Sequence, residues 1–248
     1  MVICGRCFIW RIRIRRGERG EGRGVNLFMH HELFITEDGS HSVQIPELNV
    51  SYHSKHGAIR ESVHVFIESG LKHLDKSSIS VLEVGFGTGL NALLTLIEAE
   101  KNDLQILFDV VELHPLDSVC VSALNYLSLL EAPQLTEAFS HMHACEWDVA
   151  VKISGQFALK KIRGDIRYVE LTGNYDLVYF DAFDPVVQPE LWTLDVFRKI
   201  YDAAKQGCVL VTYCSKGIVR KAMTEAGFSV SKIAGPKGKR EIVRAVKK

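Results

Sequence analysis

The sequence predicts an α/β fold with a mostly parallel, seven-stranded sheet that has helices on both faces, preceded by a small N-terminal lobe. Apolar strand-like runs alternate with amphipathic helix-like segments through most of the chain, which is typical of a doubly wound sheet. The expected strands are 79–85, 105–111, 157–163, 175–181 and 207–214, and the expected helices are 89–100, 116–130, 190–205 and 216–226. The chain closes with a strand–turn–strand pattern over 228–246, which makes one strand antiparallel.

The chain divides into three expected segments. Residues 1–27 are rich in Arg and Gly without a regular apolar period, so we expect a disordered or artefactual leader rather than a dedicated RNA-binding arm. Residues 28–75 form the small lobe, where Phe34–Ser40 predicts a strand entering a turn at Asp38-Gly39 and Ser62–Leu71 has helical spacing. Residues 76–248 form the main domain.

Composition gives the chain no net charge, with 30 basic and 30 acidic residues among 248. Residues 1–24 hold seven Arg and two Glu, so the remaining chain carries 23 basic and 28 acidic groups. A nucleic-acid partner would therefore need a local basic surface. The six cysteines show no paired framework, and no second pair completes Cys4-x-x-Cys7 as a metal site. With neither a signal peptide nor a membrane span in the pattern, we expect a cytoplasmic protein with reduced thiols and no metal.

A glycine-rich turn is the most specific motif of the chain. An apolar run ends in Glu83-Val-Gly-Phe-Gly-Thr-Gly-Leu-Asn91, and a helical pattern follows at once. A dinucleotide would require G-x-G-x-x-G. The carboxylate of Glu83 would repel a pyrophosphate, whereas it suits the cationic amino-acid end of S-adenosylmethionine. The expected cofactor-binding residues of this segment are Glu83, Gly85, Phe86, Gly87, Thr88, Gly89 and Asn91.

Acidic residues follow three further strands, whose carboxyl ends meet at one edge of such a sheet. Glu112 lies about twenty positions beyond the glycines and can accept hydrogen bonds from ribose hydroxyls. Asp165 can meet an adenine amine, although Gly-Asp is also a common turn pair. Asp181 ends a strongly apolar strand, so we expect it to be partly desolvated and held beside the reacting group of the cofactor.

The motifs together resemble the methyltransferase domain of the MnmC family of tRNA wobble-uridine modification enzymes, from about Leu33 onward. The resemblance rests on Thr36-Glu-Asp-Gly-Ser-His, Tyr52-His-Ser-x-x-His-Gly-Ala-Ile-x-Glu-Ser-x-His-Val-Phe-Ile, Gly85-Phe-Gly-Thr-Gly-Leu-Asn, Asp181-Ala-Phe-Asp-Pro, Gln188-Pro-Glu-Leu-Trp-Thr and Gly235-Pro-x-Gly-Lys-Arg-Glu. It implies a Rossmann-like class I S-adenosylmethionine-dependent methyltransferase fold. No flavin-binding module is present in the sequence, so the resemblance is to a stand-alone form without the oxidase domain.

The resemblance implies methylation of the exocyclic amine of 5-aminomethyl-2-thiouridine at tRNA position 34, giving 5-methylaminomethyl-2-thiouridine. Asp181 would accept the amine proton, with Asp184 as a competitor for that role. The expected substrate contacts are Tyr52, His53, Phe183, Pro185 and Trp192 around the base, and Lys237 and Arg240 on the anticodon-loop backbone. Lys216, Arg220, Lys221, Lys239 and Arg244 could add to the basic surface.

Two alternatives remain open at this point. Polyamine aminopropyltransferases use a similar fold and also place Asp-x-x-Asp-Pro after the fourth strand, as in Asp181–Pro185. Their glycine loop has a different form, Gly-Gly-Gly-Asp-Gly. The second alternative is a non-catalytic module that binds S-adenosylmethionine or RNA, which would keep ligand affinity without turnover.

Overall fold

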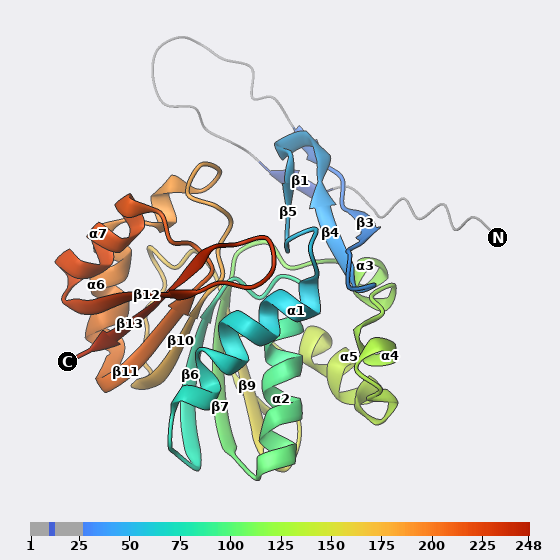
Figure 1. Ribbon diagram of the computed structural model, residues 1–248. Helices are drawn as coiled ribbons and strands as arrows, with labels where there is room; N and C mark the ends of the chain where they lie inside the picture. The colour runs from blue at the N-terminus through green and yellow to red at the C-terminus, as the bar shows by residue number, and fades with distance from the viewer. Residues whose placement is uncertain (1–9, 13–26) are drawn as a thin grey trace.

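The computed structural model describes residues 10–12 and 27–248, and its centre is an eight-stranded sheet (Figure 1). The strand order is β12-β13-β11-β10-β6-β7-β9-β8. The strands are β6 (Ser78–Val84), β7 (Gln105–Glu112), β8 (Ala150–Lys152), β9 (Phe157–Arg163), β10 (Tyr175–Phe180), β11 (Ala204–Thr212), β12 (Phe228–Ala234) and β13 (Glu241–Lys247). This order confirms the Rossmann-like α/β prediction.

The number of strands differs from the prediction. Strand β13 is antiparallel to both β11 and β12, as the terminal hairpin pattern predicted. The eighth strand, β8, pairs antiparallel with β9 at the far edge and was not predicted. Strand β8 has only three residues, whose side chains are exposed or half-exposed. They show no alternating apolar pattern, so the sequence does not predict a strand there.

Helices cover both faces of the sheet. They are α1 (Ala58–Ser62), α2 (Leu90–Asn102), α3 (Ser118–Ser122), α4 (Tyr126–Leu129), α5 (Thr136–Ala144), α6 (Leu194–Ala203) and α7 (Gly217–Ala226). A π-helix, η2 (Val63–Glu68), continues α1, and 3-10 turns occur at η1 (Pro46–Leu48), η3 (Leu71–His73), η4 (Pro133–Leu135) and η5 (Pro189–Leu191). Figure 1 shows α1 and α2 across one face, with α6 and α7 grouped beside β11–β13. The single helix expected over 116–130 is instead the pair α3 and α4, and α5 was not predicted.

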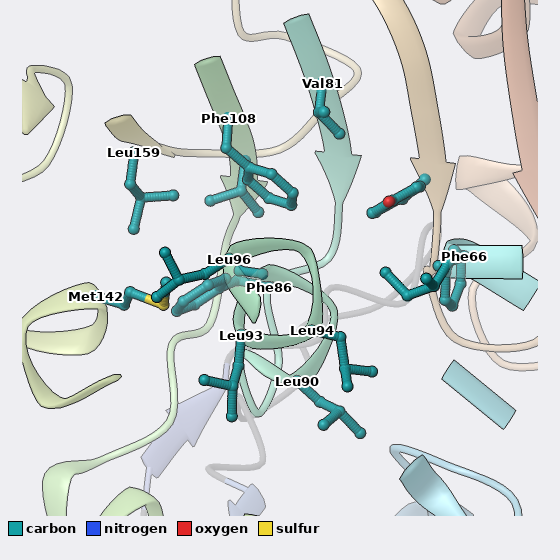
Figure 2. Packing of buried hydrophobic residues seen from close by; sticks show 14 of the residues in the cluster. Phe66, Val81, Phe86, Leu90, Leu93, Leu94, Leu96, Phe108, Met142 and Leu159 are labelled. Carbon is teal, nitrogen blue, oxygen red and sulfur yellow. The ribbon is translucent and has the colours of Figure 1, made fainter. Parts of the chain in front are cut away.

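Two apolar layers form the core, one on each face of the sheet. Along β6, Val81 belongs to the layer under α2 and its neighbour Leu82 to the layer under α6 and α7, as the two-residue period of a strand requires. Figure 2 shows the first layer, where Leu96 of α2 lies on the side of the helix that faces Phe108 and Leu159 of the sheet. Burial on both faces explains why the central strands are continuous apolar runs.

A small antiparallel sheet forms the N-terminal lobe, with β3 (Glu32–Ile35), β4 (His41–Ile45) and β5 (Val50–Ser51). The predicted turn at Asp38-Gly39 is present, with Gly39 at φ +85°. The Asp38 carboxylate accepts hydrogen bonds from Ser40 N (3.0 Å) and from Arg60 N (2.9 Å). This turn therefore ties the lobe to α1, which leads into the main domain.

Part of the predicted leader is described. Strand β1 (Trp10–Ile12) pairs antiparallel with β2 (Leu27–Met29), and the rest of that prediction lies outside the described residues. Within residues 10–12 and 27–248, no helix has the length and apolar character needed to cross a membrane.

Candidate active site

The glycine turn and Asp181 are brought together by two neighbouring parallel strands, β6 and β10. Asp181 N donates to Val84 O (3.0 Å), so the two strand ends remain paired to their last residues. Gly85 adopts φ +92°, and a Cβ at this position would lie 2.8 Å from the Asp181 carbonyl oxygen. Only glycine fits this close approach with a positive φ.

Side chains from outside the sheet pack tightly against the rest of the turn. A Cβ on Gly87 (φ +50°) would lie 2.9 Å from Tyr52 Cδ1, and one on Gly89 (φ +73°) 2.6 Å from His143 Nε2. Phe86 and Thr88, both expected to bind the cofactor, have buried side chains. These two side chains hold the turn in place, so the backbone of the turn is what faces a ligand.

Two carboxylates and one amide form the polar centre of the site. Asn91 Nδ2, in the first turn of α2, donates to Glu83 Oε1 (2.8 Å) and to Asp181 Oδ2 (2.9 Å). Glu83 is 0% exposed, and its Oε2 has no hydrogen-bond partner among the described residues; the same is true of Asn91 Oδ1. Buried polar atoms without partners are rare, and here they mark a place for a ligand.

Burial changes the protonation of both carboxyl groups. It raises the pKa of Glu83 well above its usual value, and the nearby Asp181 raises it further against the hydrogen bond from Asn91. Burial likewise raises the pKa of Asp181 to about 7, although Asn91 again opposes the shift. A carboxyl that titrates near neutral pH can accept or release a proton under physiological conditions.

Glu112 lies beside the turn as expected, but both of its oxygens already hold backbone groups. Its Oε2 accepts from Phe86 N (3.0 Å) and Gly87 N (3.1 Å), and its Oε1 accepts from His114 N (2.7 Å). Each carboxylate oxygen has two acceptor positions, so Oε1 can still accept from one hydroxyl donor. Glu112 therefore shapes the glycine turn whether or not a ribose is bound.

Asp165 follows β9 and forms an ion pair with Arg167, whose guanidinium nitrogen lies 2.5 Å from Oδ2. Burial alone would raise the pKa of Asp165, but the hydrogen bonds from Arg167 hold it below the usual value. The adenine contact predicted for Asp165 stays a prediction.

The aromatic residues predicted to contact substrate separate into two groups. The rings of Tyr52 and Phe183 meet edge-on at 5.0 Å, and both side chains are half-buried beside the glycine turn. Trp192 is 4% exposed and donates from Nε1 to Phe183 O (2.8 Å), whereas His53 is 9% exposed and pairs with Ser42 Oγ (3.1 Å). These last two rings are buried in the structure, and their stacking on a base stays a prediction. Pro185 stays half-exposed in the loop.

Most of the lysines expected at the RNA surface are in ion pairs. Lys237 Nζ lies 2.9 Å from Glu37 Oε2, and Lys216 Nζ lies 2.5 Å from Asp184 Oδ1. Arg240 is exposed. Burial tends to raise the pKa of Asp184, but Lys216 holds it below the usual value.

Three residues near the site were missed at the level of sequence. His143 Nε2 donates to Thr88 O (3.2 Å), Tyr213 donates to Ala182 O (2.8 Å), and the carboxylate of Glu61 is buried near Asp181. Glu61 carried a usable signal, since it is an acidic residue inside the apolar helical spacing that runs from Ala58 to Phe66. The other two reach the site through tertiary packing alone.

Comparisons with known proteins agree with this geometry. A family model described as S-adenosyl-L-methionine-dependent methyltransferase matches residues 131–248. The chain is 30% identical over 229 residues to the tRNA 5-methylaminomethyl-2-thiouridine biosynthesis bifunctional protein MnmC of Burkholderia multivorans, covering 85% of this chain and 34% of that protein. It is 33% identical over 212 residues to the protein of the same name from Ralstonia nicotianae, covering 78% and 31%. The chain thus spans about a third of the length of these relatives.

Among solved structures, MnmC2 from Aquifex aeolicus superposes with a TM-score of 0.70 at 29% identity, covering 88% of this chain and 70% of that chain. These matches favour a methyltransferase over an aminopropyltransferase. By its fold, its glycine turn and these relatives, the chain belongs to the S-adenosyl-L-methionine-dependent methyltransferases related to the methyltransferase domain of MnmC.

Proposed function

We propose that this protein transfers a methyl group from S-adenosylmethionine to the exocyclic amine of 5-aminomethyl-2-thiouridine at the tRNA wobble position. The product is 5-methylaminomethyl-2-thiouridine, the modification that the names of the relatives contain. The observation that carries the proposal is the Glu83–Asn91–Asp181 network beside the glycine turn, with an Asp181 pKa of about 7. An amine must lose a proton to be methylated, and this carboxylate can take it.

The residues of the site fit the proposed cofactor. The buried Oε2 of Glu83 and Oδ1 of Asn91 lack partners, and such acceptors suit the ammonium of the amino-acid end. The remaining acceptor position of Glu112, on Oε1, suits a ribose hydroxyl, and Asp165 is the candidate for the adenine amine. When bound, the cofactor supplies an electrophilic methyl on a sulfonium, which the amine lone pair takes as the sulfur–carbon bond breaks.

Asp181 has the central role in the proposed mechanism. The substrate is a primary alkyl amine, which resembles a lysine side chain and is protonated at neutral pH. An ammonium has no lone pair, so it must give its proton to the ionised Asp181 carboxylate before the nitrogen attacks. Asn91 fixes that carboxylate through its Oδ2 (2.9 Å). Holding the nitrogen in line with the methyl accounts for much of the expected acceleration.

Asp184 is the weaker candidate for this proton transfer. Its carboxylate is half-exposed and pairs with Lys216 at 2.5 Å, and its pKa lies below the usual value because Lys216 outweighs burial. A carboxylate that holds protons so weakly is a poor base for an ammonium. Asp181, with its raised pKa, fits the role better.

The half-buried pair Tyr52 and Phe183 is the proposed contact for the uracil ring, because it stands over the glycine turn. Position 34 lies in a single-stranded loop, so presenting its base costs less than extraction from a duplex. Arg240 and Lys237 would contact phosphates near the same face. Since Lys237 already pairs with Glu37, its phosphate contact would require an exchange of partners. We expect tRNA affinity to fall steeply with rising salt.

The test is mass spectrometry of nucleosides from tRNA carrying 5-aminomethyl-2-thiouridine at position 34, incubated with the protein and S-adenosylmethionine. We expect a gain of one methyl on that nucleoside, and none with the Asp181→Asn variant. Parallel reactions contain decarboxylated S-adenosylmethionine and putrescine. Methylated tRNA supports the proposal; formation of spermidine instead, or cofactor binding without any product, contradicts it.

A further inference from the structure

A half-buried lysine from the C-terminal hairpin lies close to the active site. Lys239, in the turn between β12 and β13, places Nζ 2.5 Å from Glu61 Oε1 and 3.9 Å from the centre of the Tyr213 ring. Its side chain is 28% exposed, less than half the exposure of Lys237 in the same turn. Glu61 is fixed in turn, since its Oε2 accepts from Ser54 N (2.8 Å). The ammonium is therefore held in one place by a carboxylate and an aromatic face.

Tyr213 links this ammonium to the loop that follows Asp181. Tyr213, on which Lys239 lies, donates to Ala182 O (2.8 Å), directly after Asp181. Burial raises the pKa of Asp181 most, Asn91 lowers it, the charge of Glu61 raises it and the charge of Lys239 lowers it. The carboxylate that pairs with Lys239 within ion-pair distance is Glu61. Lys239 thus stabilises the ionised form of Asp181 without forming an ion pair with it.

The other groups that face Asp181 are an amide and two groups whose neutral forms are favoured by burial. Asn91 of α2 is an amide, and burial raises the pKa of Glu83 of β6 well above its usual value. The phenol of Tyr213, after β11, has a pKa raised well above the usual value by burial. The charges that can be removed by substitution are therefore Glu61 of α1 and Lys239 of the hairpin turn.

We propose that Lys239, paired with Glu61 and lying on the ring of Tyr213, is a positioning residue that shifts the balance between the ionised and neutral forms of Asp181. The inference rests on the proposed function, in which Asp181 accepts the proton of the substrate amine. The two members of the pair act in opposite directions, Lys239 favouring the carboxylate and Glu61 the carboxylic acid. Glu61 also keeps the ammonium from binding Asp181 directly, which leaves that carboxylate available to the substrate.

The same turn provides a matched control. Lys237 lies two residues before Lys239 and also forms an ion pair with the N-terminal part of the chain, through Glu37 (2.9 Å). Both partners of that pair are largely exposed. If the lysines only fasten the turn, removing either one has the same kind of effect. If Lys239 acts by its charge on Asp181, only its removal changes the titration of Asp181.

The first measurement needs no substrate. The Asp181 carboxyl carbon is followed by 13C NMR across pH in the cofactor-free protein, with its resonance assigned by its loss in Asp181→Asn. We expect a midpoint near the pKa of about 7 in the wild type. Lys239→Met should raise the midpoint by about half a unit or more and Glu61→Gln should lower it by a similar amount, as expected for charges a short distance away. Lys239→Arg and Lys237→Met should leave it unchanged.

The second measurement is the pH dependence of kcat/KM for methylation of the tRNA. The pH at which kcat/KM falls on the acid side should shift in the same directions. It should rise in Lys239→Met and fall in Glu61→Gln. Circular dichroism melting checks that each variant is folded, and Gln at position 61 can still accept from Ser54 N. Opposite shifts support the proposal. The proposal is overturned if the Asp181 midpoint is the same in all folded variants. It is also overturned if Lys239→Met and Glu61→Gln shift the midpoint in the same direction. If the wild type makes no methylated tRNA while the NMR midpoints shift as expected, the proposed function fails and the electrostatic coupling stands.

Discussion

Strand β10 carries an aspartate near each end, and the two have opposite surroundings. Asp176, 2% exposed at the amino end, accepts from Lys76 Nζ (2.6 Å), Lys205 Nζ (2.7 Å) and Ser80 N (2.9 Å). Asp181, after the carboxyl end, accepts from a single described side chain, Asn91. Burial would raise the pKa of Asp176, but its lysines hold it below the usual value, whereas the pKa of Asp181 rises to about 7.

Burial favours the protonated form of both carboxyl groups, and their partners decide whether that shift is overcome. At the amino end the fold supplies two cations and a backbone donor. These partners keep the Asp176 carboxylate ionised and occupy its oxygens, so none is left for a ligand. At the carboxyl end it supplies one neutral amide and leaves acceptors of Glu83 and Asn91 unpaired. An incompletely satisfied, perturbed carboxylate at a strand end is characteristic of a functional site.

The largest effect is expected from Asp181→Asn, which keeps the shape of the side chain and removes its ability to take a proton. Methyl transfer in single-turnover reactions with tRNA should slow by about 100-fold or more. Titration calorimetry should find S-adenosylmethionine affinity within about threefold, because Glu83, the glycine turn and Glu112 are unchanged. A variant with near-normal turnover would falsify the base role of Asp181 and turn attention to Asp184.

Asp176→Asn is the matching change at the other end of the strand, and we expect it to affect stability. It leaves two lysines without their counter-ion, although both are about 40% exposed, so we expect a loss of about 2 kcal/mol in urea unfolding. The depressed pKa of Asp176 stabilises the fold above the unfolded-state value near 4, and this contribution is lost as pH falls through the folded pKa. The difference in unfolding free energy between Asp176→Asn and the wild type should therefore become smaller at acid pH.

Activity per folded molecule provides the control for Asp176→Asn. Asp176 lies at the opposite end of β10 from the glycine turn, so kcat should match the wild type once the folded fraction is accounted for. A large drop in kcat with unchanged stability would contradict the assignment of Asp176 to stability and of Asp181 to catalysis.

The same contrast explains how much of the site could be predicted from the sequence. Glu83, Gly85 and Asp181 are adjacent to apolar strands, and parallel strands end at one edge, so their convergence follows from local pattern. Trp192 and His53 look like exposed aromatic loop residues in sequence, but their burial depends on segments distant in the chain. Lys239 and Asp181 are brought together only by tertiary folding, because the hairpin turn must return to α1.

The fold itself was predictable where periodicity was strong. The strands from Ser78 to Lys247 that belong to the seven-stranded pattern lie within a few residues of their expected bounds. Helix α3 begins with an Asp117 cap on Cys120 N and the chain then breaks before α4, because short capped turns interrupt what looks like one apolar helix. Strand β8 depends on pairing with β9, which no local pattern predicts.

Glu83→Gln tests the neighbouring carboxyl group and has the smallest expected effect on catalysis itself. Because the folded pKa of Glu83 lies above its unfolded value, the folded protein favours the protonated group, and stability falls as pH rises above the unfolded pKa. Gln keeps an acceptor for Asn91 and does not titrate. The stability of the variant relative to wild type should therefore increase as pH rises above the unfolded pKa of Glu83, at no more than about 1.4 kcal/mol per pH unit. Urea unfolding at several pH values measures this slope.

The same variant should bind S-adenosylmethionine about tenfold more weakly, because a neutral amide replaces a group that can ionise beside the cofactor's ammonium. Turnover at saturating cofactor should change much less than in Asp181→Asn, since the base and its Asn91 donor remain. A pH-independent stability difference would mean that Glu83 stays ionised in the folded protein. In that case the carboxyl ends of β6 and β10 would hold their charges alike, although burial acts on both groups and Asn91 donates to both.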